Sequence, residues 1–165
     1  MGLYTPQNET ITIFEKAIKW VNKHRNVNEN SLREIVYIHE LAHWISHKLP
    51  HPNSPEWRLR DYIITDTFVH ESWAQLLTYW GVKYISLKYK NKNLEEIFLK
   101  FWSPLTSIDE KDIQKLKNRW FALYRFYGRI NEIKPDRKTE VFESLIELRK
   151  IKNGAHIEEW INFLI

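Results

Sequence analysis

The chain has 165 residues, of which 43% are hydrophobic and 15% aromatic, and it carries a formal net charge of +4. This composition excludes an intrinsically disordered chain, and the length provides for one domain with a sizeable core but not for two comfortable ones. We therefore expect a single domain over residues 1–165. The sequence contains no cysteine, which excludes disulfides and thiolate metal sites and fits a reducing compartment, so we expect a cytoplasmic protein.

Hydropathy and charge also limit the partners of the chain. Residues 1–9 lack the basic start and the continuous apolar run of a secretory signal. No stretch approaches the roughly 20 uninterrupted apolar residues of a membrane-spanning helix, so we expect a soluble protein without a membrane partner. The 25 basic and 21 acidic residues are mixed along the chain. This balance slightly favours acidic partners, but it is typical of a solvated, lysine-rich surface, and we expect no nucleic-acid partner.

Two helices are predicted in the first third of the chain. Apolar residues at spacings of three and four indicate an amphipathic helix over about residues 9–25. Ser31 and Glu34 have the spacing of a capping box, so the second helix is expected to begin near Leu32. It should end near Leu49, because a proline follows and cannot continue the helix.

The second helix contains the most informative motif of the chain, His39-Glu40-Leu41-Ala42-His43. At about 100° per residue, His39 and His43 lie one turn apart on the same face, where both imidazoles can bind one metal ion. Glu40 projects to the side of this pair. It can therefore contact a water molecule on the metal without occupying a coordination position.

A loose cluster of histidine and glutamate on a surface helix is the alternative explanation of this motif. The flanking sequence argues against it, because two neighbouring stripes of the helix are apolar or carry histidine, and such a helix is buried. The stripes consist of Ile35, Ile38, Ala42, Ile45 and Leu49, and of Leu32, Val36, His39, His43 and His47. Buried imidazoles need partners, since an unpaired polar group in the interior costs a few kcal/mol, and a metal ion meets that need.

A third helical stretch, over about residues 57–90, carries Glu71 in an otherwise apolar segment. Ala74 follows nearly one turn later, and small residues allow two helices to approach each other closely. We therefore expect Glu71 to reach the ion held by His39 and His43.

Two alternatives to this assignment come from the same stretch. Most glutamates on helices pair with a lysine, but the face that carries Glu71 has no lysine. His70 is the rival ligand. It points about 100° away from Glu71, so we expect a hydrogen-bonded core or surface histidine rather than a ligand.

The rest of the chain is also expected to be helical. The 57–90 stretch has candidate interruptions near residues 65–66 and at Gly81. The strand signal is confined to the short β-prone runs 11–13 and 62–64. Further helices are predicted over about residues 94–101, 107–127, 137–152 and 155–164. The expected fold is a mainly α, single compact helical domain with little or no β-sheet, built around the motif helix and the helix that bears the glutamate.

The histidine pair and the later Glu71-Ser72-Trp73-Ala74 resemble the zincin metallopeptidases, specifically the gluzincin branch, whose third zinc ligand is a glutamate on a later helix. The glutamate follows the second histidine by 28 residues, and the similarity covers about residues 32–80. The resemblance implies that Zn²⁺ is bound by His39, His43 and Glu71, and that Glu40 is the catalytic base.

The same resemblance implies hydrolysis of peptide bonds in a peptide or protein substrate. Zinc lowers the pKa of its bound water towards about 7, and Glu40 would take the proton of that water and pass it to the leaving amine. The charged intermediate of such a reaction needs another hydrogen-bond donor. The candidates are His47, His70, His156 and several tyrosines.

The sequence departs from the family pattern at two points. In thermolysin-like members, an Asp four residues after the ligand Glu orients a zinc-bound histidine, and here that position is Gln75, which polarises an imidazole less. Zincins also present a β-sheet whose edge strand binds the substrate, and no convincing sheet is predicted here. Docking of the substrate is therefore the least supported inherited feature.

Two other functions fit the same residues. One is a regulatory or toxin-like metallopeptidase that cuts a single partner protein. The other is a non-catalytic, zinc-stabilised helical module that binds protein or nucleic acid, which agrees with the pI of about 9.2 and the many aromatic residues. Metal removal should unfold such a module, whereas a catalytic site usually loses only its activity.

Overall fold

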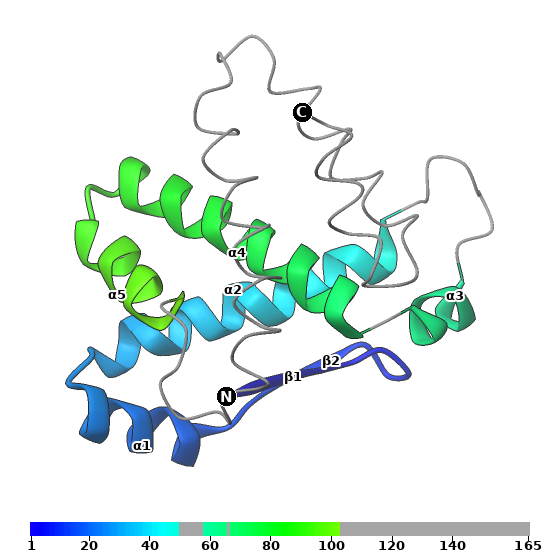
Figure 1. Ribbon diagram of the computed structural model, residues 1–165, viewed down its shortest axis with the longest axis horizontal. Helices are drawn as coiled ribbons and strands as arrows, with labels where there is room; N and C mark the ends of the chain where they lie inside the picture. The colour runs from blue at the N-terminus through cyan, green and yellow to red at the C-terminus, as the bar shows by residue number, and fades with distance from the viewer. Residues whose placement is uncertain (50–57, 66, 103–165) are drawn as a thin grey trace, which may run out of the picture. The chain divides into compact units, whose positions relative to one another are not determined.

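The computed structural model describes residues 1–49, 58–65 and 67–102, and Figure 1 shows how their elements follow one another. This part of the chain is mainly helical and contains one two-stranded sheet, which confirms the predicted mainly α class. The elements are β1 (Gly2–Thr5), β2 (Thr10–Ile13), α1 (Glu15–Arg25), α2 (Glu29–Lys48), α3 (Leu59–Ile64), α4 (Thr67–Lys88) and α5 (Lys92–Trp102). The helices predicted after residue 103 lie outside the described residues.

Contacts divide the chain into two compact units. The first comprises Met1–Leu49 and Trp73–Ser103, and the second comprises Pro50–Ser72 and Pro104–Ile165. Helix α4 crosses this division without a break. The expectation of one domain over the whole chain stays a prediction. No helix in the described ranges is long and apolar enough to cross a membrane.

The first predicted helix is wrong over residues 10–13, which form strand β2 instead. Strands β1 and β2 pair antiparallel, with Gly2 opposite Ile13 and Tyr4 opposite Ile11. The four residues Thr-Ile-Thr-Ile are all β-branched, and such residues favour a pleated, half-buried strand. The backbone hydrogen bonds between β1 and β2 stabilise the strand, and they cannot be inferred from the sequence of either segment alone. Helix α1 therefore begins only at Glu15.

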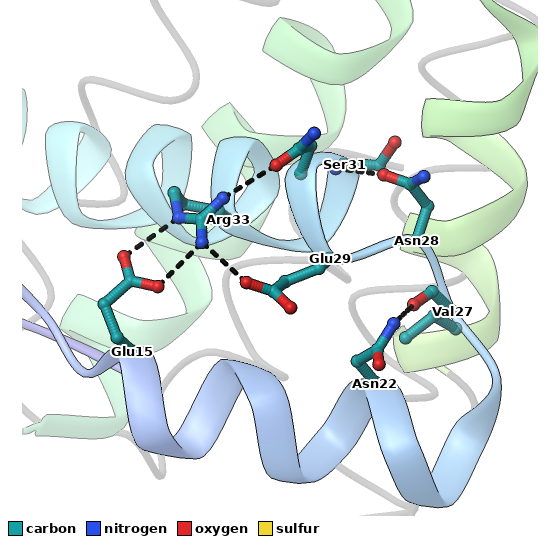
Figure 2. Close-up of polar contacts among 8 residues, drawn as sticks. Glu15, Asn22, Val27, Asn28, Glu29, Ser31 and Arg33 are labelled. Atoms are coloured by element: carbon teal, nitrogen blue, oxygen red, sulfur yellow. Dashed lines mark hydrogen bonds and ion pairs between the residues drawn. The ribbon is translucent and has the colours of Figure 1, made fainter.

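Helix α2 begins three residues earlier than the predicted start near Leu32. Its N-cap is Asn28, whose side-chain oxygen accepts a hydrogen bond of 2.9 Å from the backbone N–H of Ser31 (Figure 2). The predicted capping box at Ser31 is thus wrong, because an asparagine caps a helix at least as well and lies earlier in the chain. The other end agrees with the prediction, since α2 ends at Lys48 and Leu49 is extended.

The Arg33 side chain links α2 to α1 at the surface through hydrogen bonds and an ion pair. Its guanidinium donates two hydrogen bonds to the Glu15 carboxylate, at 2.9 and 2.7 Å, and one of 2.9 Å to Glu29 (Figure 2). A fourth hydrogen bond of 2.9 Å joins it to the side chain of Asn30. These contacts hold the pKa of Glu15 below its ordinary value, chiefly through the hydrogen bonds from Arg33.

The hydrophobic core of the first unit lies under the first half of α2. It includes buried residues from α1, α2, α4 and α5, and Ile18, Leu32, Val82 and Leu94 are at most 1% exposed. The cluster consists of Ile18, Val21, Val27, Leu32, Ile35, Val36, Val82, Leu94, Ile97 and Phe98. This packing fixes the start of α2, and the histidine motif follows on the next turns of the same rigid helix.

The third helical stretch is interrupted at one of its two candidate positions. Helix α3 ends before Thr65, which is extended, and α4 begins at Thr67. The β-prone run 62–64 is helical, because it belongs to α3. Gly81 does not interrupt α4. A Cβ atom at Gly81 would lie 3.0 Å from Cγ2 of Ile38, so this glycine permits a close approach of α4 to α2.

Candidate metal centre

The two histidines of the motif point their Nε2 atoms at each other. Nε2 of His39 lies 3.2 Å from Nε2 of His43, and the ring centroids are 4.8 Å apart with an interplanar angle of 88°. Two nitrogen ligands at tetrahedral zinc, each about 2.05 Å from the ion, are about 3.3 Å apart. The spacing of the two imidazoles therefore fits a pair of ligands that share one ion.

Glu71, in the second turn of α4, completes this group. One ligand atom from each of His39, His43 and Glu71 lies within 4.8 Å of the other two. His43 is buried, His39 is partly buried, and Glu71 keeps part of its surface accessible. The structure thus brings together the three residues that the sequence predicted as metal ligands. Two imidazole nitrogens and one carboxylate are the ligand set that zinc accepts in catalytic sites.

The side of α4 that faces α2 carries small side chains. Ala74 and Thr78 are both 0% exposed, and Gly81 follows on the same face at the helical spacing. Ala74 therefore lies in the packed interior. Because these side chains are small, α4 lies close enough to α2 for a direct contact between Thr78 and His39.

Thr78 determines which nitrogen of His39 is available. Its hydroxyl donates a 2.6 Å hydrogen bond to the backbone carbonyl of Ala74, so its single proton is already used. The same oxygen lies 3.3 Å from Nδ1 of His39 and can only accept from it. His39 therefore carries its proton on Nδ1, and the lone pair of Nε2 faces His43.

The sequence did not indicate Thr78 as this partner. The family pattern directed attention to position 75, which is Gln75 here. Thr78 lies one helical turn after Ala74, so its proximity to His39 follows from the packing of two helices and not from a local motif. A small, polar residue on the face of α4 that also carries Glu71 was the available signal.

Glu40 is buried without a polar partner. It is 6% exposed, and it forms neither a hydrogen bond nor an ion pair with any residue that the structure describes. Its carboxylate oxygens are not among the buried side-chain atoms without a hydrogen-bond partner, so they keep contact with the surface. A carboxylate with this position, directly after a metal-ligand candidate, is available for a chemical role.

His47, a candidate donor for the charged intermediate, lies one turn after His43 and contacts β1. Its Nδ1 atom and the hydroxyl of Tyr4 share a hydrogen bond of 2.6 Å, and both residues are buried. Burial and, second, the nearby charge of Glu9 raise the pKa of Tyr4 to about 12, so the phenol is neutral at physiological pH. The sequence did not single out Tyr4, because strand β1 was not predicted.

His70 contacts α3 rather than the other histidines. Its Nε2–H donates a 2.8 Å hydrogen bond to the carbonyl of Tyr62, and the two rings are in contact, with centroids 4.0 Å apart and a tilt of 33° between the ring planes. This is the hydrogen-bonded role expected for His70. His156 lies outside the described residues.

The chain matches no protein-family model, no curated protein and no solved structure. The assignment of a function therefore depends on the residues and on the geometry described above.

Proposed function

We propose that this protein is a zinc-dependent metallopeptidase of the gluzincin type. His39, His43 and Glu71 would hold the metal, and Glu40 would be the general base. The observation that carries the proposal is the convergence of three ligand atoms within 4.8 Å of one another, two of them imidazole nitrogens only 3.2 Å apart. The resemblance of the motif residues to the gluzincins supports the same conclusion.

The chemistry divides between the metal and the protein. When bound, zinc supplies a Lewis acid that polarises the substrate carbonyl and makes water more acidic. Glu40 would accept the proton of the attacking water and deliver it to the leaving amine. Burial supports this role, since a carboxylate that is 6% exposed and has no hydrogen bond to a described residue keeps its oxygen lone pairs available.

Thr78 would act on the metal site through His39. By accepting the Nδ1 proton, it keeps the imidazole in the tautomer that presents Nε2 to the metal. A neutral hydroxyl polarises the ring less than a carboxylate does. We therefore expect zinc to be bound less tightly than in sites where an aspartate has this position.

The substrate is proposed to be a peptide or a protein, with action on one specific partner protein as the narrower form of the same function. A cytoplasmic location, expected from the absence of cysteine, is part of this proposal. The alternative is a zinc-stabilised module without activity. Its structural zinc would normally have four protein ligands, whereas the ligand group found among the described residues has three.

The decisive experiment compares the wild-type protein with Glu40→Gln by zinc analysis and by digestion of a peptide library. Both proteins should bind one zinc per chain, and Glu40→Gln should lower cleavage by at least about 100-fold. Glu34→Gln is the matched control, because Glu34 is an exposed glutamate on the same helix. It should leave cleavage unchanged.

Two results would count against the proposal. Loss of zinc from Glu40→Gln would contradict the role of Glu40 as a base that is not a ligand. A zinc-loaded wild-type protein that cleaves no peptide and unfolds when the metal is chelated would favour the non-catalytic module.

A further inference from the structure

We infer that Gly2 is a positioning residue for Glu40: the absent side chain at position 2 of β1 creates the space that the Glu40 carboxylate occupies. The inference deepens the proposed function and rests on it for the catalytic role of Glu40. Its structural part, the contact between β1 and Glu40, can be tested separately.

The geometry leaves no room for a side chain at position 2. A Cβ atom added to Gly2 would lie 2.5 Å from Oε1 and 2.6 Å from Cγ of Glu40, and 2.8 Å from Cγ1 of Val36. Real Cβ atoms essentially never show contacts under 3.0 Å. Gly2 does not have a positive φ angle, so its backbone conformation is open to any residue. Space beside Glu40 is therefore the reason for a glycine at this position.

Strand β1 is held in place on both sides of this contact. Gly2 pairs with Ile13 across the hairpin, and the carbonyl of Met1 accepts a 2.9 Å hydrogen bond from the N–H of Phe14. Tyr4 points to the same face of the strand as position 2, and its buried hydroxyl bonds to His47 at 2.6 Å. An added Cβ would therefore displace the Glu40 side chain more readily than the strand.

This arrangement explains how Glu40 can be fixed without a polar partner. The side chain packs against the backbone of Gly2 and the side chain of Val36, which restrict it sterically. A general base held in this way has a defined position.

The test combines Gly2→Ala with Glu40→Ala in a double-mutant cycle on stability. Gly2→Ala should lower the urea midpoint of the wild-type protein, and it should lower the midpoint less in the Glu40→Ala background, where the added methyl group has space. Leu3→Ala is the matched control, because Leu3 is 51% exposed on the opposite face of the same strand. Its effect on the midpoint should be the same in both backgrounds.

Kinetics provide the second measurement. Gly2→Ala should lower kcat by about 100-fold, the cost of a misplacement of about 1 Å, while KM and the zinc content stay unchanged. A crystal structure of Gly2→Ala should show a displaced Glu40 carboxylate.

The inference is overturned if Gly2→Ala has the same effect on stability in both backgrounds, including failure to fold in both. It is also overturned if Gly2→Ala keeps the kcat of an active wild-type enzyme. If the wild-type protein cleaves no peptide, the proposed function fails, whereas the stability cycle and the crystal structure still decide whether Gly2 positions Glu40.

Discussion

Replacement of Thr78 by valine tests the orientation of His39. Valine has nearly the shape of threonine but no hydroxyl, so packing at this fully buried position is preserved. The Nδ1–H of His39 loses its acceptor, which lies 3.3 Å away. Without metal, the imidazole can move its proton to the other nitrogen. With metal on Nε2, the proton must stay on Nδ1, and this partly buried donor loses the Thr78 hydroxyl as an acceptor.

The substitution should therefore destabilise the zinc-bound protein and weaken zinc binding. Removal of one hydrogen-bond partner costs about 1 kcal/mol, and up to about 3 kcal/mol at a buried position, and about 1.4 kcal/mol corresponds to a factor of ten in a binding constant. The dissociation constant for zinc should rise about 10- to 100-fold, the range typical of groups that orient a metal-bound histidine. The stability of the metal-free protein should fall by about 1 kcal/mol, because the hydrogen bond to the carbonyl of Ala74 is also lost.

Competition with a chromogenic zinc chelator would measure this affinity. Thr65→Val is the matched control, since its hydroxyl donates an equivalent 2.8 Å hydrogen bond to the carbonyl four residues earlier and it is also buried. It should lower stability without changing zinc affinity, and Thr78→Ser should retain most of the wild-type affinity. Equal zinc affinity of Thr78→Val and the wild type would refute the orientation of His39 by Thr78.

Three further predictions concern stability. The pKa of Tyr4 is raised from 10.0 to about 12 by burial and, second, by a nearby carboxylate. The neutral phenol therefore contributes fully to the stability of the fold below pH 10, and this contribution is lost as the pH rises from 10 to about 12. Tyr4→Phe should abolish this loss in urea midpoints measured against pH, and a profile equal to that of the wild type would contradict the prediction. The Arg33 guanidinium lowers the pKa of Glu15 from 4.5. The ion pair therefore stabilises the fold above pH 4.5, and this stabilisation is lost as the pH falls through the lowered pKa. Arg33→Gln should make the urea midpoint depend less on pH in the acidic range, and an equal dependence in the variant and the wild type would count against the ion pair. Leu32→Ala should lower the free energy of unfolding by about 2–5 kcal/mol, because Leu32 is 1% exposed in the core; a loss below 1 kcal/mol in a urea titration would show that this core is not packed as described.

Features that depend on neighbouring residues follow from the sequence, whereas features that depend on distant segments do not. The helical spacing of His39 and His43 follows from the 3.6-residue period, so sequence alone sufficed to place both on one face of α2. Residues 10–13 were assigned to a helix because their apolar spacing also fits that period. Their strand depends on a partner, residues 2–5, that pairs with them across the hairpin. The start of α2 was misplaced because both Asn28 and Ser31 can cap a helix.

The sequence by itself determined the mainly helical class and the residues that could bind a metal, because both depend on periodicity and on side-chain chemistry along each helix taken separately. Only the tertiary structure decided what surrounds the motif. Thr78 meets His39 and Tyr4 meets His47 over separations of 39 and 43 residues. No local pattern encodes such contacts, since they depend on how closely α4 and β1 pack against α2, and that closeness depends on small residues such as Ala74 and Gly2.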